Sequence, residues 1–255
     1  MGTATDIAIA CEHVASGYGR NVLMGDINLT IRRGEIVFIL GGSGSGKSTL
    51  LKHIIGQVPP LSGAIRIFGR DIVHAEGADR ERILRDFGVM YQSGALFGNL
   101  SVLGNVLLPL EELTALPEPL RQAAARMKLA QVGLLDRADA MPAELSGGQR
   151  KRAAIARAMA LDPGILFLDE PSAGLDPVTS ASLDALIRGL SRDLGMTVVI
   201  ISHELASIRA IADRAIYLDR SVGGVLDQGP PDALAASPHD AVRAFFNARP
   251  APKEP

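Results

Sequence analysis

The segment from Gly41 to Ser48 joins an apolar run to a stretch with helical spacing, and its residue types suit phosphate chemistry. It reads Gly-Gly-Ser-Gly-Ser-Gly-Lys-Ser between the apolar run 36–40 and the helix-like residues 49–55. Glycines let successive backbone N–H groups turn toward an anion, and the following helix adds unpaired N–H groups and its positive dipole end. Lys47 is expected to reach the β- and γ-phosphates, and the Ser48 hydroxyl to bind Mg²⁺.

A flexible Gly/Ser turn is the alternative interpretation of this segment. The strand-like run before it and the helix-like run after it favour nucleotide binding instead, because that context is what turns the pattern into a phosphate site. The nucleotide contacts expected here are Gly41, Gly42, Ser43, Gly44, Ser45, Gly46, Lys47, Ser48 and Thr49.

Two further apolar runs each end in a side chain that suits phosphate chemistry. Residues 165–168 precede Asp169 and Glu170, and residues 198–201 lead to His203. Asp169 is suited to hold Mg²⁺ through water, and Glu170 to orient and deprotonate an attacking water. His203 is suited to hydrogen-bond the γ-phosphate. Taken singly, an Asp-Glu pair after a strand is often a turn or a helix cap, and a lone histidine is usually structural.

The order of the motifs along the chain narrows the interpretation. The phosphate loop is followed by Gln92, Leu145-Ser146-Gly147-Gly148-Gln149, the run ending in Asp169-Glu170, Gly174-Leu175-Asp176 and His203. In this order they resemble the nucleotide-binding subunit of ATP-binding-cassette (ABC) transporters, over essentially the whole chain. The resemblance implies an ATPase that uses ATP and Mg²⁺ and couples hydrolysis to transport.

The resemblance also implies roles for residues outside the phosphate loop. Tyr18 would stack on adenine, and Gln92 would reach Mg²⁺ and the attacking water and link the nucleotide to a helical subdomain. Ser146, Gly147 and Gly148, with Gln149 beside them, would contact the γ-phosphate of an ATP held by a second copy of the chain. Asp176 would lie at the interface of that dimer. The expected catalytic residues are Lys47, Gln92, Glu170 and His203, and the expected Mg²⁺ ligands are Ser48, Gln92 and Asp169.

The segments that surround these motifs resemble a narrower group, the ATPases of Mla- and Mce-type lipid transport systems. The similarity lies in residues 92–97, 101–106, 201–205, 211–215 and 242–246. Gln149 departs from it, because many Mce-type relatives have Met there, and the hairpin at 221–224 is longer than usual. The narrower resemblance implies phospholipid transport through a separate membrane permease, at the cytoplasmic face of the bacterial inner membrane. An Mce-type substrate-binding protein and a small STAS-type subunit would be further partners.

Other functions of ABC-type ATPases compete with lipid transport. A role on DNA or the ribosome is disfavoured, because the chain has one cassette and no long coiled coil between its two phosphate motifs. An ABC transporter ATPase for another cargo, such as amino acids or lipoproteins, stays open, since cargo is chosen mainly by the permease.

Alternating strand-like and helix-like segments predict how the site residues are positioned. Such alternation predicts an α/β fold with a parallel sheet and a ligand at the carboxyl ends of its strands. Strands are expected over 7–14, 22–31, 36–40, 64–68, 89–92, 165–168, 198–201, 215–218 and 224–226, with a turn at 16–20. Helices are expected over 49–55, 150–161 (capped by Ser146), 179–194 and 204–212, in the tail from 231, and over 101–135 with interruptions at Pro109, Pro117 and Pro119.

Family resemblance extends this to a P-loop NTPase (RecA-like) parallel sheet core with an antiparallel β subdomain and an inserted helical subdomain. We expect one ABC ATPase domain over 1–255. Its core and β subdomain are expected at about 1–91 and 160–230, its helical subdomain at about 92–159 and a C-terminal helical tail at about 231–255.

The charge composition of the chain gives no indication of nucleic-acid binding. The 255 residues are 47% hydrophobic and carry a net charge of −2, with 26 basic against 28 acidic residues, so no global nucleic-acid footprint is present. The single cysteine excludes an internal disulfide and fits a reducing compartment. Because no run approaches the length of a membrane span, we expect a soluble, cytoplasmic chain.

Overall fold

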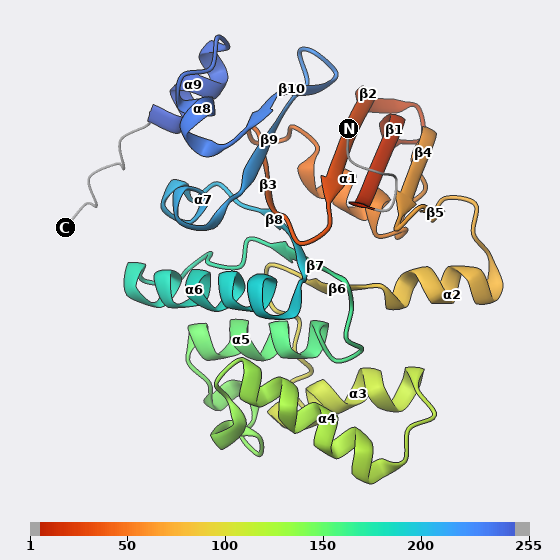
Figure 1. Cartoon of the computed structure of the whole chain (residues 1–255), viewed down its shortest axis with the longest axis vertical. Coiled ribbons are helices and arrows are strands. Elements are labelled where there is room, and N and C mark those ends of the chain that lie inside the picture. The colour runs from red at the N-terminus through yellow and green to blue at the C-terminus, as the bar shows by residue number, and fades with distance from the viewer. Residues whose placement is uncertain (1–5, 248–255) are drawn as a thin grey trace.

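The computed structural model describes residues 6–247, in which two sheets lie side by side (Figure 1). The larger sheet has the strand order β10-β9-β3-β8-β7-β6, in which only β10 runs antiparallel to its neighbour. Its strands are β3 (Ile36–Leu40), β6 (Phe87–Met90), β7 (Ile165–Asp169), β8 (Thr197–Ile201), β9 (Arg214–Asp219) and β10 (Gly224–Gly229). The smaller sheet is antiparallel, with the order β2-β1-β4-β5, and consists of β1 (Ile7–Tyr18), β2 (Asn21–Arg32), β4 (Ser62–Ile67) and β5 (Arg70–Asp71).

Helices connect and cover these strands. They are α1 (Lys47–Ile54), α2 (Gly77–Arg85), α3 (Val102–Leu113), α4 (Glu118–Gln131), α5 (Gly147–Ala158), α6 (Pro177–Leu194), α7 (Leu205–Ile211), α8 (Pro231–Ala235) and α9 (Asp240–Asn247), with 3-10 turns η2 (Leu135–Arg137) and η3 (Pro142–Glu144). Figure 1 shows α3, α4 and α5 grouped at one end of the molecule, and α8 and α9 near β10 at the other. Within residues 6–247, no helix combines the length and the apolar content that a membrane crossing needs.

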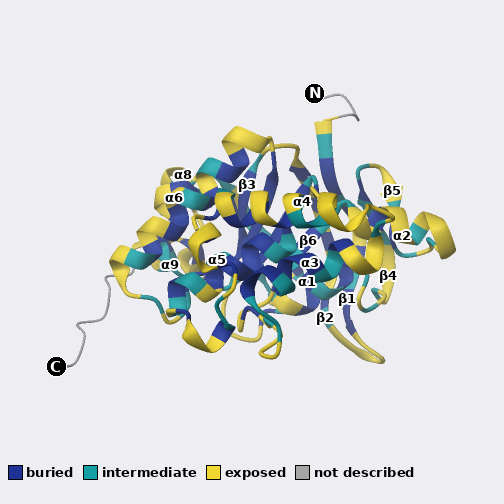
Figure 2. Ribbon diagram, turned by 90° about the horizontal axis from the view of Figure 1, so that it is seen from below, coloured by how far each residue is buried: buried dark blue, intermediate teal, exposed yellow. Residues whose placement is uncertain are grey.

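The larger sheet separates two hydrophobic cores, because successive side chains of a strand point to opposite faces. In β3, Ile36, Phe38 and Leu40 join the core formed with α3 to α9, whereas Val37 and Ile39 join the core formed with α1 and the smaller sheet. All five residues are buried. Figure 2 shows these central strands dark blue between helices whose outer faces are yellow. The arrangement confirms the predicted α/β fold, with its parallel core, antiparallel β subdomain and inserted helices.

Three local expectations differ from the structure. Helix α3 continues through Pro109, where an interruption was expected, because its face with Val106 and Leu110 is buried in the core and offsets the lost backbone bond. The turn expected at 16–20 is shorter, since β1 extends to Tyr18 and pairs with Asn21. Helix α2 was not expected, because its residues are mostly charged and only Ile83 among them is buried.

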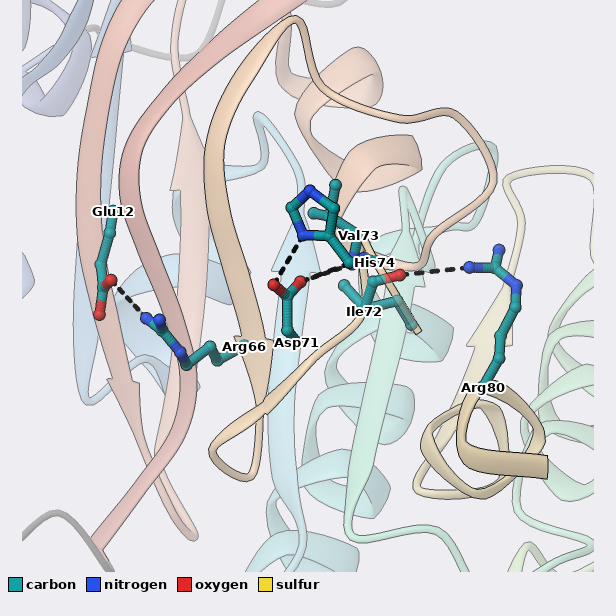
Figure 3. A network of polar contacts seen from close by, with 7 residues as sticks. All are labelled: Glu12, Arg66, Asp71, Ile72, Val73, His74 and Arg80. Carbon is teal, nitrogen blue, oxygen red and sulfur yellow. Dashed lines mark hydrogen bonds and ion pairs between the residues drawn. The ribbon is translucent and has the colours of Figure 1, made fainter. Parts of the chain in front are cut away.

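The connection from β4 to α2 is held by polar contacts (Figure 3) in addition to the burial of Ile72 and Ile83. Asp71 accepts hydrogen bonds from the Val73 backbone N–H at 2.8 Å and from His74 Nδ1 at 2.8 Å. Arg80 donates to the Ile72 carbonyl at 3.2 Å. A second pair in the figure, Glu12 with Arg66, ties β1 to β4. Figure 3 thus shows a structural network, outside the expected nucleotide contacts.

Candidate nucleotide-binding site

The loop between β3 and α1 has a backbone that requires glycine. Gly41, Gly44 and Gly46 have φ angles of 148°, 72° and 97°, in the region that side chains disfavour. A Cβ on Gly41 would lie 2.4 Å from the Leu218 carbonyl oxygen. Helix α1 then starts without a side-chain cap and without an acidic residue in its first turn. Its first N–H groups therefore remain available for an anion.

Lys47 crosses this loop from the first position of α1. Its Nζ donates to the carbonyl oxygens of Gly41 at 2.8 Å and Gly42 at 3.0 Å, and lies 3.4 Å from Ser45 Oγ. Burial lowers its pKa, while the charges of Glu170 and Asp169 act in the opposite direction. The ammonium group is therefore held beside the loop and within the field of both carboxylates.

Strand register brings the other expected residues to the same edge of the sheet. Ile201 of β8 lies between Ile39 of β3 and Asp169 of β7, and Met90 of β6 lies beside Leu168. The segments that follow these strands therefore begin at one edge: the phosphate loop, Ser202-His203, Glu170 and Gln92. The carboxyl ends of parallel strands are where such sheets bind ligands.

Asp169 lies in a field of competing charges. Burial, and then the charge of Glu170, raises the pKa of this carboxyl, and the ammonium groups of Lys151, Lys47 and Lys52 oppose that rise. Together with the Ser48 hydroxyl and the Gln92 amide, Asp169 offers only oxygen donors. That donor set fits Mg²⁺, which is typically bound through one or two protein oxygens, waters and substrate phosphates.

Glu170 combines strained backbone with an unsatisfied side chain. Its φ is 48°, in the left-handed region, and its Oε1 lies 2.8 Å from His203 Nδ1. The other oxygen, Oε2, is buried and has no hydrogen-bond partner among the described residues. Residues held in this way tend to occur at functional sites, because the rest of the fold must compensate for their cost. The geometry leaves one carboxylate oxygen free to accept a proton, and an exposed histidine ring beside it.

Gln92 is connected to Glu170 by a residue that sequence reasoning missed. Lys151, in α5, donates from Nζ to the backbone carbonyl of Gln92 at 2.5 Å and to that of Glu170 at 3.3 Å. Its side chain is only 8% exposed, which is unusual for lysine. The segment Leu145-Ser146-Gly147-Gly148-Gln149 is called the signature below. Lys151 follows it by two residues on a helix, which is a sequence signal, but nothing in the sequence indicates the partners of Lys151.

The signature residues form a helix start that packs against the Asp176 loop. Ser146 Oγ accepts from the Gln149 N–H at 3.2 Å, and Gln149 Oε1 accepts from the Ser146 N–H at 2.9 Å, which is a capping box. A Cβ on Gly148 would lie 2.4 Å from Thr179 Cγ2, and one on Gly147 would lie 3.4 Å from Leu175. Close approach of α5 to the start of α6 therefore requires glycine at 148.

Asp176 caps α6 beside this signature. Its Oδ1 accepts from the N–H groups of Val178 and Thr179, each at 3.0 Å, and its Oδ2 accepts from the Thr179 hydroxyl at 2.5 Å. Within the described residues, the hydrogen bonds of Ser146 and Asp176 stay in their own helix starts, and none reaches the phosphate loop.

Tyr18 stands at the end of β1 beside the phosphate-loop helix. Its ring is 44% exposed, and its centroid lies 6.5 Å from that of His53 in α1. His53 is fully buried, with Nε2 3.3 Å from the Gly17 N–H and Nδ1 2.9 Å from the Val58 carbonyl oxygen. An exposed aromatic ring is therefore anchored through its neighbouring residue to the helix that begins at Lys47.

The chain is similar in sequence to a known protein family and to several named proteins. The sequence profile described as ABC transporter matches residues 24–173. The chain is 41% identical to the intermembrane phospholipid transport system ATP-binding protein MlaF of Escherichia coli over 230 residues, which cover 90% of this chain and 84% of that protein. It is 40% identical to the methionine import ATP-binding protein MetN 2 of Rhodopseudomonas palustris, covering 94% of this chain and 64% of that one.

A solved cassette structure has the same fold. The ATP-binding cassette MJ0796, described as a dimer in a post-hydrolysis state bound to ADP and Pi, superposes with a TM-score of 0.77 at 33% identity. The superposition covers 87% of this chain and 98% of MJ0796.

Proposed function

This chain belongs to the ABC transporter family and is the ATP-hydrolysing subunit of such a transporter, and we propose that it powers phospholipid transport through a separate membrane permease. The choice of phospholipid as cargo rests on the similarity to MlaF, whose name states phospholipid transport. The two sequences are 41% identical over 90% of this chain. The resemblance of residues 92–97 and 101–106 to Mla- and Mce-type ATPases supports the same cargo.

In the proposed reaction, ATP is the substrate and Lys47 with the loop amides of residues 41–49 binds its phosphates. Ser48, Gln92 and Asp169 would hold Mg²⁺, which neutralises phosphate charge when bound. Glu170 would accept the proton of the attacking water at Oε2, the oxygen that has no hydrogen-bond partner among the described residues. His203 would hold Glu170 through Nδ1 and leave its second ring nitrogen for the γ-phosphate.

We further propose that each ATP is held between two copies of the chain. Among the described residues, the hydrogen bonds of Ser146 stay within its own helix start and those of Lys47 within the phosphate loop, which supports a γ-phosphate contact supplied by a second copy. Gly147, Gly148 and Gln149 would add the first turn of α5, whose dipole favours negative charge. Asp176, beside the signature, would lie at the interface, and Tyr18 would stack on adenine. The dimeric state of MJ0796 supports the same arrangement.

We propose that about 92–159 act as a helical subdomain inserted into a core and β subdomain at about 1–91 and 160–230. The tail proposed at about 231–255 includes α8 and α9, and its last eight residues lie outside the described ones. The proposed partners are the permease, an Mce-type substrate-binding protein and a STAS-type subunit, at the cytoplasmic face of the bacterial inner membrane.

A second candidate cargo is an amino acid, supported by the 40% identity to MetN 2, and a lipoprotein is a third. Extraction in mild detergent, followed by identification of the co-purifying membrane subunits, tests the proposal. Reconstituted complex should then transfer fluorescent phospholipid between vesicles in an ATP-dependent way. Transport of methionine in place of lipid, by a permease of a different class, would overturn the proposed cargo and leave the ATPase assignment intact.

A further inference from the structure

Lys151 occupies a position where a lysine is costly. Its side chain is 8% exposed, and burial lowers the pKa of its ammonium group, against the charges of Glu170 and Asp169. The buried ammonium is compensated by the two carbonyl oxygens of Gln92 and Glu170, at 2.5 and 3.3 Å. These two residues are 59 and 19 positions away in the chain. One side chain therefore joins two segments that both reach the proposed ATP site.

The Glu170 end of this contact is the strained residue of the site. Its left-handed backbone is fixed by its N–H, which donates to the Ile201 carbonyl at 2.8 Å, and by its carbonyl, which accepts from the Ala173 N–H at 3.2 Å. Lys151 adds a charged donor to the same carbonyl oxygen. Charge-assisted bonds are stronger than neutral ones, so Lys151 contributes to holding a conformation that a non-glycine residue would otherwise avoid.

Lys151 itself lies on α5, the helix that starts at the signature. Ser146 caps α5, Lys151 follows a little more than one turn later, and Arg157 near the end of α5 donates to the carbonyls of Gly94 and Ala95 at 3.0 and 2.8 Å. Helix α5 therefore holds the loop after Gln92 at two points. Of the α5 side chains in the described part of the chain, only Lys151 also donates to Glu170.

We propose that Lys151 is a positioning residue that ties the signature helix and Gln92 to the backbone of Glu170. A displacement of α5, such as a second copy would cause by contacting Ser146, then reaches the general base through one side chain. This inference rests on the proposed role of Glu170. It assigns Lys151 no contact with ATP, so its effect belongs to turnover and not to nucleotide affinity.

The test is a double-mutant cycle that combines Lys151→Met with Glu170→Gln, in the reconstituted complex. Lys151→Met alone should lower the turnover rate by about 10- to 100-fold, the size expected when a reacting group is misplaced by about 1 Å. The dissociation constant for ATP should stay within about twofold of wild type. In the Glu170→Gln background the side chain that Lys151 positions is already disabled, so adding Lys151→Met should cost much less turnover than it does in wild type, and only through the contact with Gln92.

Arg152→Met is the matched control, since Arg152 is the next residue of α5 and also donates to backbone carbonyls, at Val132 and Ser182. Its turnover should stay within about threefold of wild type. Lys151→Arg, which keeps a charged donor, should recover most of the rate. If Lys151→Met does not fold, Lys151→Gln enters the same cycle.

Three outcomes would overturn the inference: unchanged turnover in Lys151→Met, a matching loss of ATP affinity, or an equal loss of turnover in both backgrounds. Failure of the underlying function gives a different result. Near-normal hydrolysis in Glu170→Gln alone would refute Glu170 as the base, whatever Lys151 does.

Discussion

Replacing Glu170 by Gln distinguishes a proton acceptor from a structural partner of His203. Gln keeps the length of the side chain and an oxygen that accepts from His203 Nδ1, which lies 2.8 Å from Glu170 Oε1. The substitution removes the charge and the ability to take a proton at the buried Oε2, which has no partner in the described part of the chain. If Glu170 is the base, turnover should fall by about 10²–10⁴-fold. That loss corresponds to about 2.7–5.4 kcal/mol in the activation barrier.

The same substitution should stabilise the nucleotide-free protein. Burial raises the pKa of Asp169, and the charge of Glu170 raises it further. Removing that charge relieves repulsion between the two carboxylates while the bond to His203 is kept. Lys47 and Lys151 lose the attraction of Glu170, but both keep that of Asp169 and their carbonyl acceptors, so we expect the relief to dominate. Substitutions that relieve a cost held for function gain on the order of 1 kcal/mol. For a chain of this size, that gain is about 2–4 °C in Tm.

The pH dependence of this gain has a definite sign. An acid whose pKa is raised in the folded state loses stability as the pH rises through that pKa, because the folded state then holds an unfavourable charge. Asp169 is such an acid. The stabilisation by Glu170→Gln should therefore be complete near neutral pH and should shrink as the pH falls into the range where Asp169 takes up its proton.

Thermal unfolding followed by circular dichroism, together with phosphate release under single-turnover conditions, measures both effects. Glu170→Ala is the control, since it also removes the oxygen that accepts from His203 and should not reach the stability of Glu170→Gln. A Tm that falls by several degrees in Glu170→Gln while hydrolysis persists would refute the reasoning, because Glu170 would then be a structural carboxylate.

Two further predictions concern buried residues behind the site. His53→Leu leaves the buried Gly17 N–H without its partner, so we expect about 1–3 kcal/mol of destabilisation in denaturant unfolding. ATP affinity should also fall, because Gly17 precedes Tyr18, and His53→Gln should recover part of both; equal ATP affinity in His53→Leu and wild type would contradict this. For Cys11, burial raises the thiol pKa to about 12, so iodoacetamide at about pH 8 should label only the unfolded chain. Labelling of the folded protein at the unfolded rate would be the contrary result.

Local patterns were sufficient to predict the elements that hold the phosphate site. The run 36–40 indicated β3, and Ser146 as a helix cap indicated the start of α5, because a buried strand and a helix cap are encoded by neighbouring residues. Helix α2 was not predicted, since its contacts with the rest of the fold are largely polar, as Arg80 shows by donating to the Ile72 carbonyl. Pro109 misled for the opposite reason: burial of α3 outweighs a local rule.

The candidate site residues could likewise be predicted from local patterns in some cases and not in others. Lys47, Asp169 and His203 could be named because each follows a recognisable strand or loop, and strand register then gathers them at one edge. The contact of Lys151 with Gln92 and Glu170 could not be predicted, because it depends on residues far apart in the chain and on a left-handed backbone at Glu170. Sequence patterns give the chemistry of a side chain, whereas its partners are set by tertiary structure.

A hybrid dimer tests most directly whether ATP is held between two copies of the chain. One copy carries Ser146→Arg, which places bulk and positive charge at the cap of α5, and the other carries Lys47→Ala, which removes the cation beside the phosphate loop. Both carry Glu170→Gln, so that bound ATP is not hydrolysed. If sites form between copies, one site combines an intact Lys47 with an intact Ser146, and the other has both defects. The account predicts about one ATP trapped per hybrid dimer and none in either homodimer. Zero ATP in the hybrid would contradict it, because sites built within one chain would both be damaged.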